Sequence, residues 1–165
     1  MTRRLTAQPL TREAFAPFGD VIDTDWSERI EINAGMATRF HAIAKAETDA
    51  AGSTIISLFR GNPYSFPLEL KMVERHPLGS QAFMPLTPAP FLVVVCPDGP
   101  DGPGEPVPFL TAPGQGVNYR RNVWHAVLTP IGQKQDFVVV DRGGEGNNLE
   151  EFHFQEAWEI ALPEA

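Results

Sequence analysis

Prolines and glycines break this chain into short segments and constrain its fold more than any other feature. Sixteen prolines and fourteen glycines occur among 165 residues. Proline lacks the backbone N–H that a helix interior or a central strand needs, and glycine favours turns. The apolar runs between these breaks are short and rich in Val, Ile and Phe, which is typical of strands separated by turns. We therefore expect strands at residues 53–59, 68–74, 81–86, 91–96, 107–110, 124–129, 136–141 and 150–155.

Many short strands at close spacing predict an all-β sandwich or barrel in a single domain over residues 1–165. Helix signals are few: Thr11 can cap a short helix over "REAFAPF" that ends before Gly19, and residues 42–50 are a second candidate. The terminal segment "EAWEIAL" fits either a helix or a strand. Residues 97–106 are rich in Pro, Gly and acidic side chains and predict an exposed loop, to which we attach no function.

The charge and the cysteine content narrow the class of protein. The formal net charge of −8 argues against nonspecific nucleic-acid binding, because that needs clustered Lys and Arg. Cys96 is the single cysteine, so an intrachain disulfide is impossible and a reducing compartment is expected. No apolar run approaches the roughly 20 residues that span a bilayer, and "MTRRLTAQPL" lacks the apolar region of a signal peptide. We therefore expect a soluble cytoplasmic protein with no nucleic-acid or membrane partner.

The first unusual group of polar residues is in "VERHPLGSQAF", residues 73–83. On a strand, residues two apart share a face, so Glu74 and His76 point the same way. The proline and glycine that follow predict a turn, which would bring Gln81 back to the same region. The alternative is that these side chains only solvate the end of a strand.

A second polar group is in "GQGVNYRRNVWHAVL". Within eight residues it contains Asn118, Arg120, Arg121, Asn122 and His125. A polar hairpin turn would explain Asn122. It does not readily explain a histidine that follows tryptophan at the start of a half-buried strand, so His125 is a candidate for chemistry.

The intervals in these two segments are similar to those of cupins, small β-barrels with two metal-ligand motifs. One cupin motif is HxH followed four or five residues later by Glu, and the other contains GxxxxxPxGxxH. This chain has Glu74-x-His76-x4-Gln81 and Gly114-x5-Arg120-x-Asn122-x2-His125, so the intervals match although several residue types differ. A divalent metal held by His76 and His125, with Glu74 or Gln81, would suit nickel, zinc or iron. The same side chains could instead transfer protons without a metal.

A third group, "DFVVVDRGG", places Asp141 and Arg142 at the end of an apolar run and before two glycines. Arginine binds a carboxylate through two parallel hydrogen bonds, which suits recognition of a small acid. The alternative is an Asp–Arg pair that closes the end of a strand.

Taken together, "ERHPLGSQAFMPL", "GVNYRRNVWHAVL" and "DFVVVDRGG" closely resemble the ureidoglycolate lyase family, as do "PLTREAFAPFGDVID" and "INAG". The resemblance runs from about residue 8 to about residue 145. It implies a cupin-like β-barrel of the jelly-roll type, often paired as a homodimer, and it favours nickel among the metals. From the strand and helix signals we expect two or three short helices in this barrel. The implied reaction splits (S)-ureidoglycolate into glyoxylate and urea during allantoin and purine breakdown. Glu31 precedes "INAG" where some relatives carry histidine, so we give it no role, although we expect this segment near the site.

The residue types suit that reaction. Ureidoglycolate is a hemiaminal, in which one carbon carries a carboxylate, a hydroxyl and a urea nitrogen, so cleavage of the C–N bond needs a base, an acid and a cation for the carboxylate. Histidine and glutamate can transfer protons, and arginine can orient a carboxylate. The predicted catalytic residues are Glu74, His76, Gln81 and His125. The predicted substrate-binding residues are Arg121, which we prefer as the anchor, Arg142, Asn118 and Tyr119.

Three other functions remain open at this point. Amide hydrolysis of the same substrate would release ammonia, and it is disfavoured because Cys96 lies in an apolar strand and no histidine-rich set offers a two-metal site. A cupin oxygenase or isomerase would carry iron or manganese. A non-enzymatic cupin would bind a small organic acid tightly without turnover.

Overall fold

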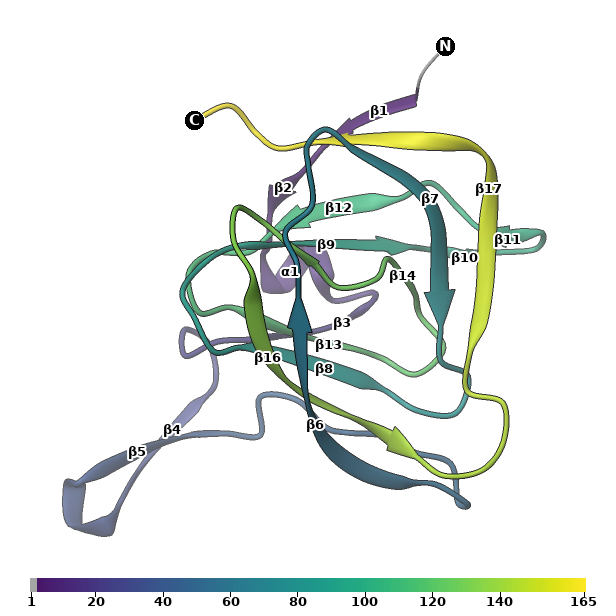
Figure 1. Cartoon of the computed structure of the whole chain (residues 1–165). Helices are drawn as coiled ribbons and strands as arrows, with labels where there is room; N and C mark the ends of the chain where they lie inside the picture. Colours follow the sequence, from purple (N-terminus) through teal and green to yellow (C-terminus); the bar gives the residue numbers. More distant parts are fainter. Residues whose placement is uncertain (1–2) are drawn as a thin grey trace.

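The computed structural model describes residues 3–165, and β-strands dominate it (Figure 1). The strands are β1 (Arg3–Thr6), β2 (Gln8–Pro9), β3 (Gly19–Ile22), β4 (Glu28–Ile32), β5 (Ala37–His41), β6 (Ser53–Gly61), β7 (Leu68–Arg75), β8 (Gln81–Pro85), β9 (Phe91–Cys96), β10 (Asp98–Gly99), β11 (Gly102–Pro103), β12 (Val107–Leu110), β13 (Gly116–Tyr119), β14 (Trp124–His125), β15 (Thr129–Pro130), β16 (Gln135–Gly143) and β17 (Glu150–Ala161). The helices are α1 (Arg12–Phe15) and the 3-10 helix η1 (Asn33–Gly35).

Two sheets form the body of the protein. The larger is eight-stranded, in the order β1-β17-β7-β14-β9-β12-β2, with β15 also paired to β9. Its two edge strands, β1 and β2, are separated in sequence by Ala7 alone, which is buried. A chain that passes directly from one edge to the other requires the sheet to curl until it almost closes. The smaller sheet is five-stranded, in the order β3-β13-β8-β16-β6, and in Figure 1 β8 and β13 lie below β9 and β12.

Alternation along the strands creates two hydrophobic cores. On β9, Phe91, Val93 and Val95 pack with the smaller sheet, whereas Leu92, Val94 and Cys96 pack with residues of the larger sheet itself. Every residue of this strand is buried, because it has a core on both faces. The prediction of an all-β, cupin-like barrel is confirmed, and the prediction of a single domain over residues 1–165 stays a prediction.

The helix predictions were partly right. Thr11 caps α1 as expected, since its Oγ1 accepts a hydrogen bond from the Ala14 N–H at 3.2 Å. The helix predicted at residues 42–50 is wrong. Its backbone pairs instead with the turn after β7, through Ser80 N to Glu47 O (3.0 Å) and Asp49 N to Leu78 O (2.9 Å). These tertiary hydrogen bonds outweigh a weak helix propensity. The ambiguous C-terminal segment is a strand, because β17 pairs with β7 as far as Ile160.

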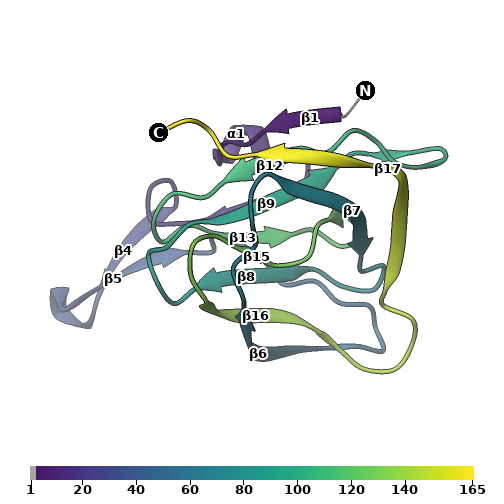
Figure 2. The ribbon, with the colours of Figure 1, turned by 45° about the horizontal axis from the view of Figure 1, so that its top comes forward.

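The hairpin of β4 and β5 extends away from the barrel in both views (Figures 1 and 2). Its tip contains Asn33 and Ala34 in the left-handed region, each with φ of 55°. Among residues 3–165, β4 and β5 pair with each other as a separate two-stranded sheet. We expected the "INAG" segment near the site, but it lies at this tip. Within residues 3–165, no helix has the length and apolar character that a membrane crossing requires.

Candidate functional site

A cavity of about 380 Å³ opens between the two sheets. It is lined by Phe59, Arg60, Gly61, Glu74, Gln81, Phe83, His125, Val127 and Leu128. The polar lining comes from Arg60 on β6, Glu74 on β7, Gln81 on β8 and His125 on β14, and most of the remaining wall is apolar. A largely apolar hollow with a few convergent polar groups is the usual form of a small-molecule site.

Strand pairing explains why His125 faces this cavity. Trp124 pairs with Cys96 and packs in the core of the larger sheet, so the next residue must take the opposite face. His125 pairs with Glu74 on β7, and residues opposite each other on neighbouring strands share a face. The alternation along β14 therefore accounts for a histidine after a buried tryptophan.

The structure brings Glu74, His76 and His125 together. One ligand atom from each lies within 4.8 Å of the others, although about fifty positions separate the two histidines in sequence. The two imidazole rings are 5.2 Å apart between centroids, and Glu74 Oε1 lies 3.8 Å from His76 Nε2. Gln81 is the fourth member, since its Oε1 lies 3.1 Å from the same nitrogen. We call Glu74, His76, Gln81 and His125 the acceptor cluster.

Both ring nitrogens of His76 face acceptor oxygens. Nδ1 lies 2.8 Å from the backbone oxygen of Asn148, so Nδ1 carries a hydrogen and donates it. On the other side, Nε2 faces the Gln81 oxygen and the Glu74 carboxylate. If Nε2 carried only a lone pair, it would face two other acceptors, and none of the three could form a hydrogen bond. Either a proton or a metal cation is needed at this place.

His125 presents a lone pair to the same place. Its Nδ1 lies 2.9 Å from the carbonyl oxygen of Ala126 and so carries the ring hydrogen, while Nε2 is buried without a hydrogen-bond partner among residues 3–165. The ring stacks on Tyr119 at 4.2 Å between centroids, with 7° between the planes. Burial lowers the pKa of His125 to about 3; the hydrogen bond to the Ala126 carbonyl raises the pKa in part, and nearby His76 contributes to lowering it. The ring is therefore neutral near pH 7.

The acceptor cluster fits a divalent cation. Burial raises the pKa of the Glu74 carboxyl, partly offset by His76, and nearby Glu151 raises it as well. Three acceptor groups lie near His76 Nε2: the Nε2 of His125, the Glu74 carboxylate and the Gln81 oxygen. No hydrogen-bond donor from residues 3–165 lies among them. Both histidines fix their Nδ1 hydrogens on backbone carbonyls, which is how metal-binding histidines are commonly oriented.

Arg142 lies outside the acceptor cluster, in a different setting. Its side chain is 1% exposed and pairs with Asp49 through two hydrogen bonds of 2.8 and 3.2 Å. It also donates to the backbone oxygens of Gly144 at 3.2 Å and Glu145 at 2.6 Å. Every nitrogen of its guanidinium is thus engaged, and the partner is Asp49 rather than the adjacent Asp141. A substrate carboxylate would have to displace Asp49.

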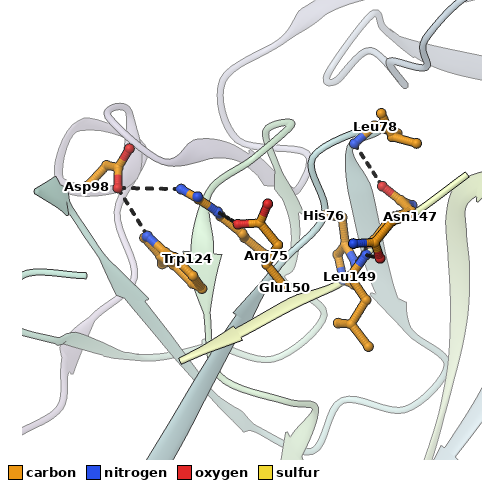
Figure 3. Close-up of polar contacts among 9 residues, drawn as sticks. Arg75, His76, Leu78, Asp98, Trp124, Asn147, Leu149 and Glu150 are labelled. Atoms are coloured by element: carbon orange, nitrogen blue, oxygen red, sulfur yellow. Dashed lines mark hydrogen bonds and ion pairs between the residues drawn. The ribbon is translucent and has the colours of Figure 1, made fainter. Parts of the chain in front are cut away.

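The other arginines lie around the rim. Arg121 is exposed and donates from Nε to the Pro77 oxygen at 2.6 Å, which places it beside the turn that follows His76. Arg120 is also exposed and borders a separate hollow near Lys45. Arg75 points away from Glu74 and His76, as alternation predicts. It contacts Asp98 and Glu150 and lies over the Trp124 ring (Figure 3).

Asn118 and Tyr119 take opposite faces of β13. Asn118 is buried and donates to Asp20 Oδ2 at 3.2 Å and to the Lys45 oxygen at 3.4 Å, away from the acceptor cluster. Tyr119 is also buried and stacks on His125, and burial, with a contribution from Glu74, raises the pKa of its hydroxyl. Of these two β13 residues, both predicted to bind substrate, Tyr119 is the one that touches the acceptor cluster.

Two contributors to the site were not identified from the sequence. Asn148 accepts from His76 through its backbone, and its side chain accepts from the Leu78 N–H at 2.8 Å. Asp141 accepts from the Gln81 amide at 3.1 Å. The first lies in "GEGNN", which has the composition of an ordinary turn, so no sequence signal marks it. The second was considered only as a partner of Arg142.

Comparison with known proteins identifies the family. The sequence profile of ureidoglycolate lyases matches residues 2–161. The chain is 65% identical to the ureidoglycolate lyase of Mesorhizobium japonicum, over 97% of this chain and 99% of that protein. The chain belongs to the ureidoglycolate lyase family. It is also 61% identical to the ureidoglycolate lyase of a Chelativorans species, over 98% and 99% of the two chains, and 55% identical to ureidoglycolate lyase 2 of Rhizobium meliloti, over 94% and 96%. The family match includes both sheets and the whole acceptor cluster.

Proposed function

We propose that this protein is a carbon–nitrogen lyase that cleaves (S)-ureidoglycolate to glyoxylate and urea. The observation that carries the proposal is the acceptor cluster beside a small cavity, in a chain whose close relatives are named ureidoglycolate lyases. The reaction would belong to allantoin and purine breakdown.

The residues of the cluster suit the two proton transfers of this reaction. The hydroxyl loses its proton as the glyoxylate carbonyl forms, and the electron pair of the C–N bond passes to nitrogen, which gains a proton to give urea. Glu74, whose raised pKa makes it a stronger base than an ordinary carboxylate, suits the first transfer. His76 suits the second, because its Nε2 faces the Gln81 oxygen and the Glu74 carboxylate, and a proton held between these groups can pass to the departing nitrogen. His125, with a pKa near 3, suits neither as a donor at neutral pH.

A divalent metal would take the place of the proton beside His76 Nε2. Glu74, His76 and His125 would hold it, with the Gln81 oxygen beside them. Such an ion supplies Lewis acidity, which lowers the pKa of a bound hydroxyl. We propose nickel as the first ion to test, on the strength of the family resemblance, with zinc and iron as comparisons.

Product analysis tests the function. Purified protein is incubated with racemic ureidoglycolate before and after chelator treatment, and glyoxylate, urea and ammonia are followed separately. We expect equal amounts of glyoxylate and urea, no ammonia, and conversion of half the racemate. Ammonia release would instead identify an amidohydrolase, and tight binding without products would identify a non-enzymatic acid-binding cupin.

We also propose that the protein is a homodimer, and its outer surface supports this. Strand β6 lies at the edge of the smaller sheet, with Ile56 77% and Leu58 71% exposed. Val140 and Val138 lie opposite them on β16, so an apolar strip continues across two strands. Exposed apolar edge strands are templates for pairing with another chain. Light scattering at micromolar concentration should give the mass of two chains, and Leu58→Glu combined with Ile56→Glu should give one. The cytoplasmic location stays a prediction from the single cysteine.

A further inference from the structure

A line of polar side chains connects β16 to His76. The Gln81 amide nitrogen donates to Asp141 Oδ2 at 3.1 Å, and the Gln81 oxygen lies 3.1 Å from His76 Nε2. Gln81 is 6% exposed, and the ladder between β8 and β16 pairs the neighbouring residues Ala82 and Val140. Gln81 and Asp141 are therefore held side by side on the face that looks toward the larger sheet.

The side-chain amide of Gln81 has two different ends, and Asp141 decides which end faces the site. An ionised carboxylate only accepts hydrogen bonds, so the amide nitrogen must face Asp141. The amide oxygen must then face His76. We propose that Asp141 is a positioning residue, whose carboxylate holds an oxygen of Gln81 rather than an N–H group against the metal-binding side chains.

The orientation matters because of what the cluster would hold. An amide oxygen can contact a divalent cation or accept a hydrogen from His76, whereas an amide N–H can do neither and would repel a cation. Residues that orient metal ligands typically change metal affinity 10–100-fold when they are replaced. The inference rests on the proposed function, because that function gives the cluster its cation.

A purely structural role does not account for Asp141. Among residues 3–165, Gln81 is the one side chain that donates to it. Its neighbour Arg142 pairs with Asp49 instead. The ladder from Phe137 to Val140 already joins β16 to β8, so Asp141 is not needed to hold these strands together.

A swap of amide and carboxylate tests the orientation. The full chain is stripped of metal and titrated with Ni²⁺ by calorimetry, and unfolding temperatures are recorded for each variant. In Asp141→Asn, the new amide can donate to the Gln81 oxygen, which allows the Gln81 amide to turn and present its N–H to His76. We expect Ni²⁺ affinity to fall 10–100-fold. The double variant D141N/Q81E keeps the net charge and presents a carboxylate oxygen in either orientation, so we expect Ni²⁺ affinity to recover at least about tenfold relative to D141N.

The chain offers a matched control. Gln115 donates to Asp23 Oδ2 at 3.0 Å, the same pair of groups at a distance from the cluster. Asp23→Asn should therefore leave Ni²⁺ affinity unchanged. A general loss caused by removing any carboxylate that accepts from a glutamine would appear in this variant too.

The outcomes separate this inference from the proposed function. Wild-type affinity in D141N overturns the inference, and so does a swap variant that binds no better than D141N. A wild-type protein that cleaves ureidoglycolate but binds no ion also overturns it and leaves the lyase assignment intact. A wild-type protein that binds Ni²⁺ but cleaves nothing removes the lyase assignment, and the affinity comparison still decides the role of Asp141. If D141N does not fold, recovery of both folding and affinity in the swap variant supports the inference, and its absence overturns it.

Discussion

Adjacent residues on β16 serve two polar clusters that differ in how their hydrogen bonds are satisfied. Arg142 belongs to the first cluster, in which every guanidinium nitrogen donates to Asp49 or to a backbone oxygen. Asp141 supports the second, the acceptor cluster, in which lone pairs face one another and His125 Nε2 has no hydrogen-bond partner in the described part of the chain. The satisfied cluster stabilises the fold. The unsatisfied one destabilises it unless something else binds there, which is the usual mark of a functional site.

The largest effect should follow from replacing the histidines of the acceptor cluster. His76→Ala and His125→Ala should each lower turnover of ureidoglycolate at least roughly 100-fold, because each removes a proton carrier or a metal ligand. Both variants should stay folded, because the pairing of β14 with β7 and β9 is made by the backbone and does not depend on either ring. Steady-state kinetics and circular dichroism test both points. Near-normal activity in both variants would place the site elsewhere.

Replacing Arg142 in the first cluster should lower the stability of the fold rather than the activity. Arg142→Lys removes the bidentate contact of a buried guanidinium with Asp49 and the hydrogen bonds to the backbone oxygens of Gly144 and Glu145. We expect the unfolding temperature to fall by about 5 °C or more, with KM for ureidoglycolate unchanged within about twofold. Arg60→Lys is the matched control, because Arg60 makes the same two-bond contact with Asp136 but is exposed, so its unfolding temperature should barely change. A large rise in KM with unchanged stability in Arg142→Lys would reverse the comparison.

Acid should destabilise the metal-free protein through His125. The folded pKa is lowered to about 3 from 6.5, so the unfolded chain binds a proton that the folded chain does not between these values. The contribution of neutral His125 to the free energy of unfolding is therefore fully present above about pH 6.5. It is lost as the pH falls toward 3, by at most about 1.4 kcal/mol per pH unit for one proton. His125→Gln should flatten this slope in urea unfolding between pH 7 and pH 5. His153→Gln, at an exposed histidine, should keep it, and an unchanged slope in His125→Gln would show that the buried ring is not its source.

The sequence predicted what depends on local periodicity and missed what depends on distant pairing. Turn residues defined the strands, and a period of two correctly set Glu74 and His76 on one face, with Arg75 on the other. The pairing of Arg142 with Asp49 spans 93 positions and has no local signal, so Asp141 was the natural but wrong partner. The segment that contains Asp49 was also predicted to be a helix, at residues 42–50. It is not helical, because its backbone forms hydrogen bonds with residues 78–80. The Asn148 carbonyl that orients His76 is a backbone group, which composition does not reveal.

The smallest effect concerns the substrate carboxylate, for which Arg121 stays our predicted anchor. Arg142 is fully engaged and Arg75 points away. Arg121 is exposed, and it donates to the carbonyl of Pro77, the residue that follows His76 directly. Arg121→Lys should keep the charge but lose the planar two-bond contact, so KM should rise about tenfold with little change in kcat, equivalent to about 1.4 kcal/mol.

Arg120→Lys is the control for this variant, since Arg120 is equally exposed but borders the separate hollow near Lys45. Its KM should not change. A fall in kcat at constant KM in Arg121→Lys would mean that the residue acts in the transition state rather than in substrate capture. Wild-type constants in both variants would exclude an arginine anchor at these two positions. If Arg60 in the cavity wall is likewise dispensable, recognition of the carboxylate would fall to backbone N–H groups or to a cation in the acceptor cluster, and the Ni²⁺ dependence of KM would distinguish these two.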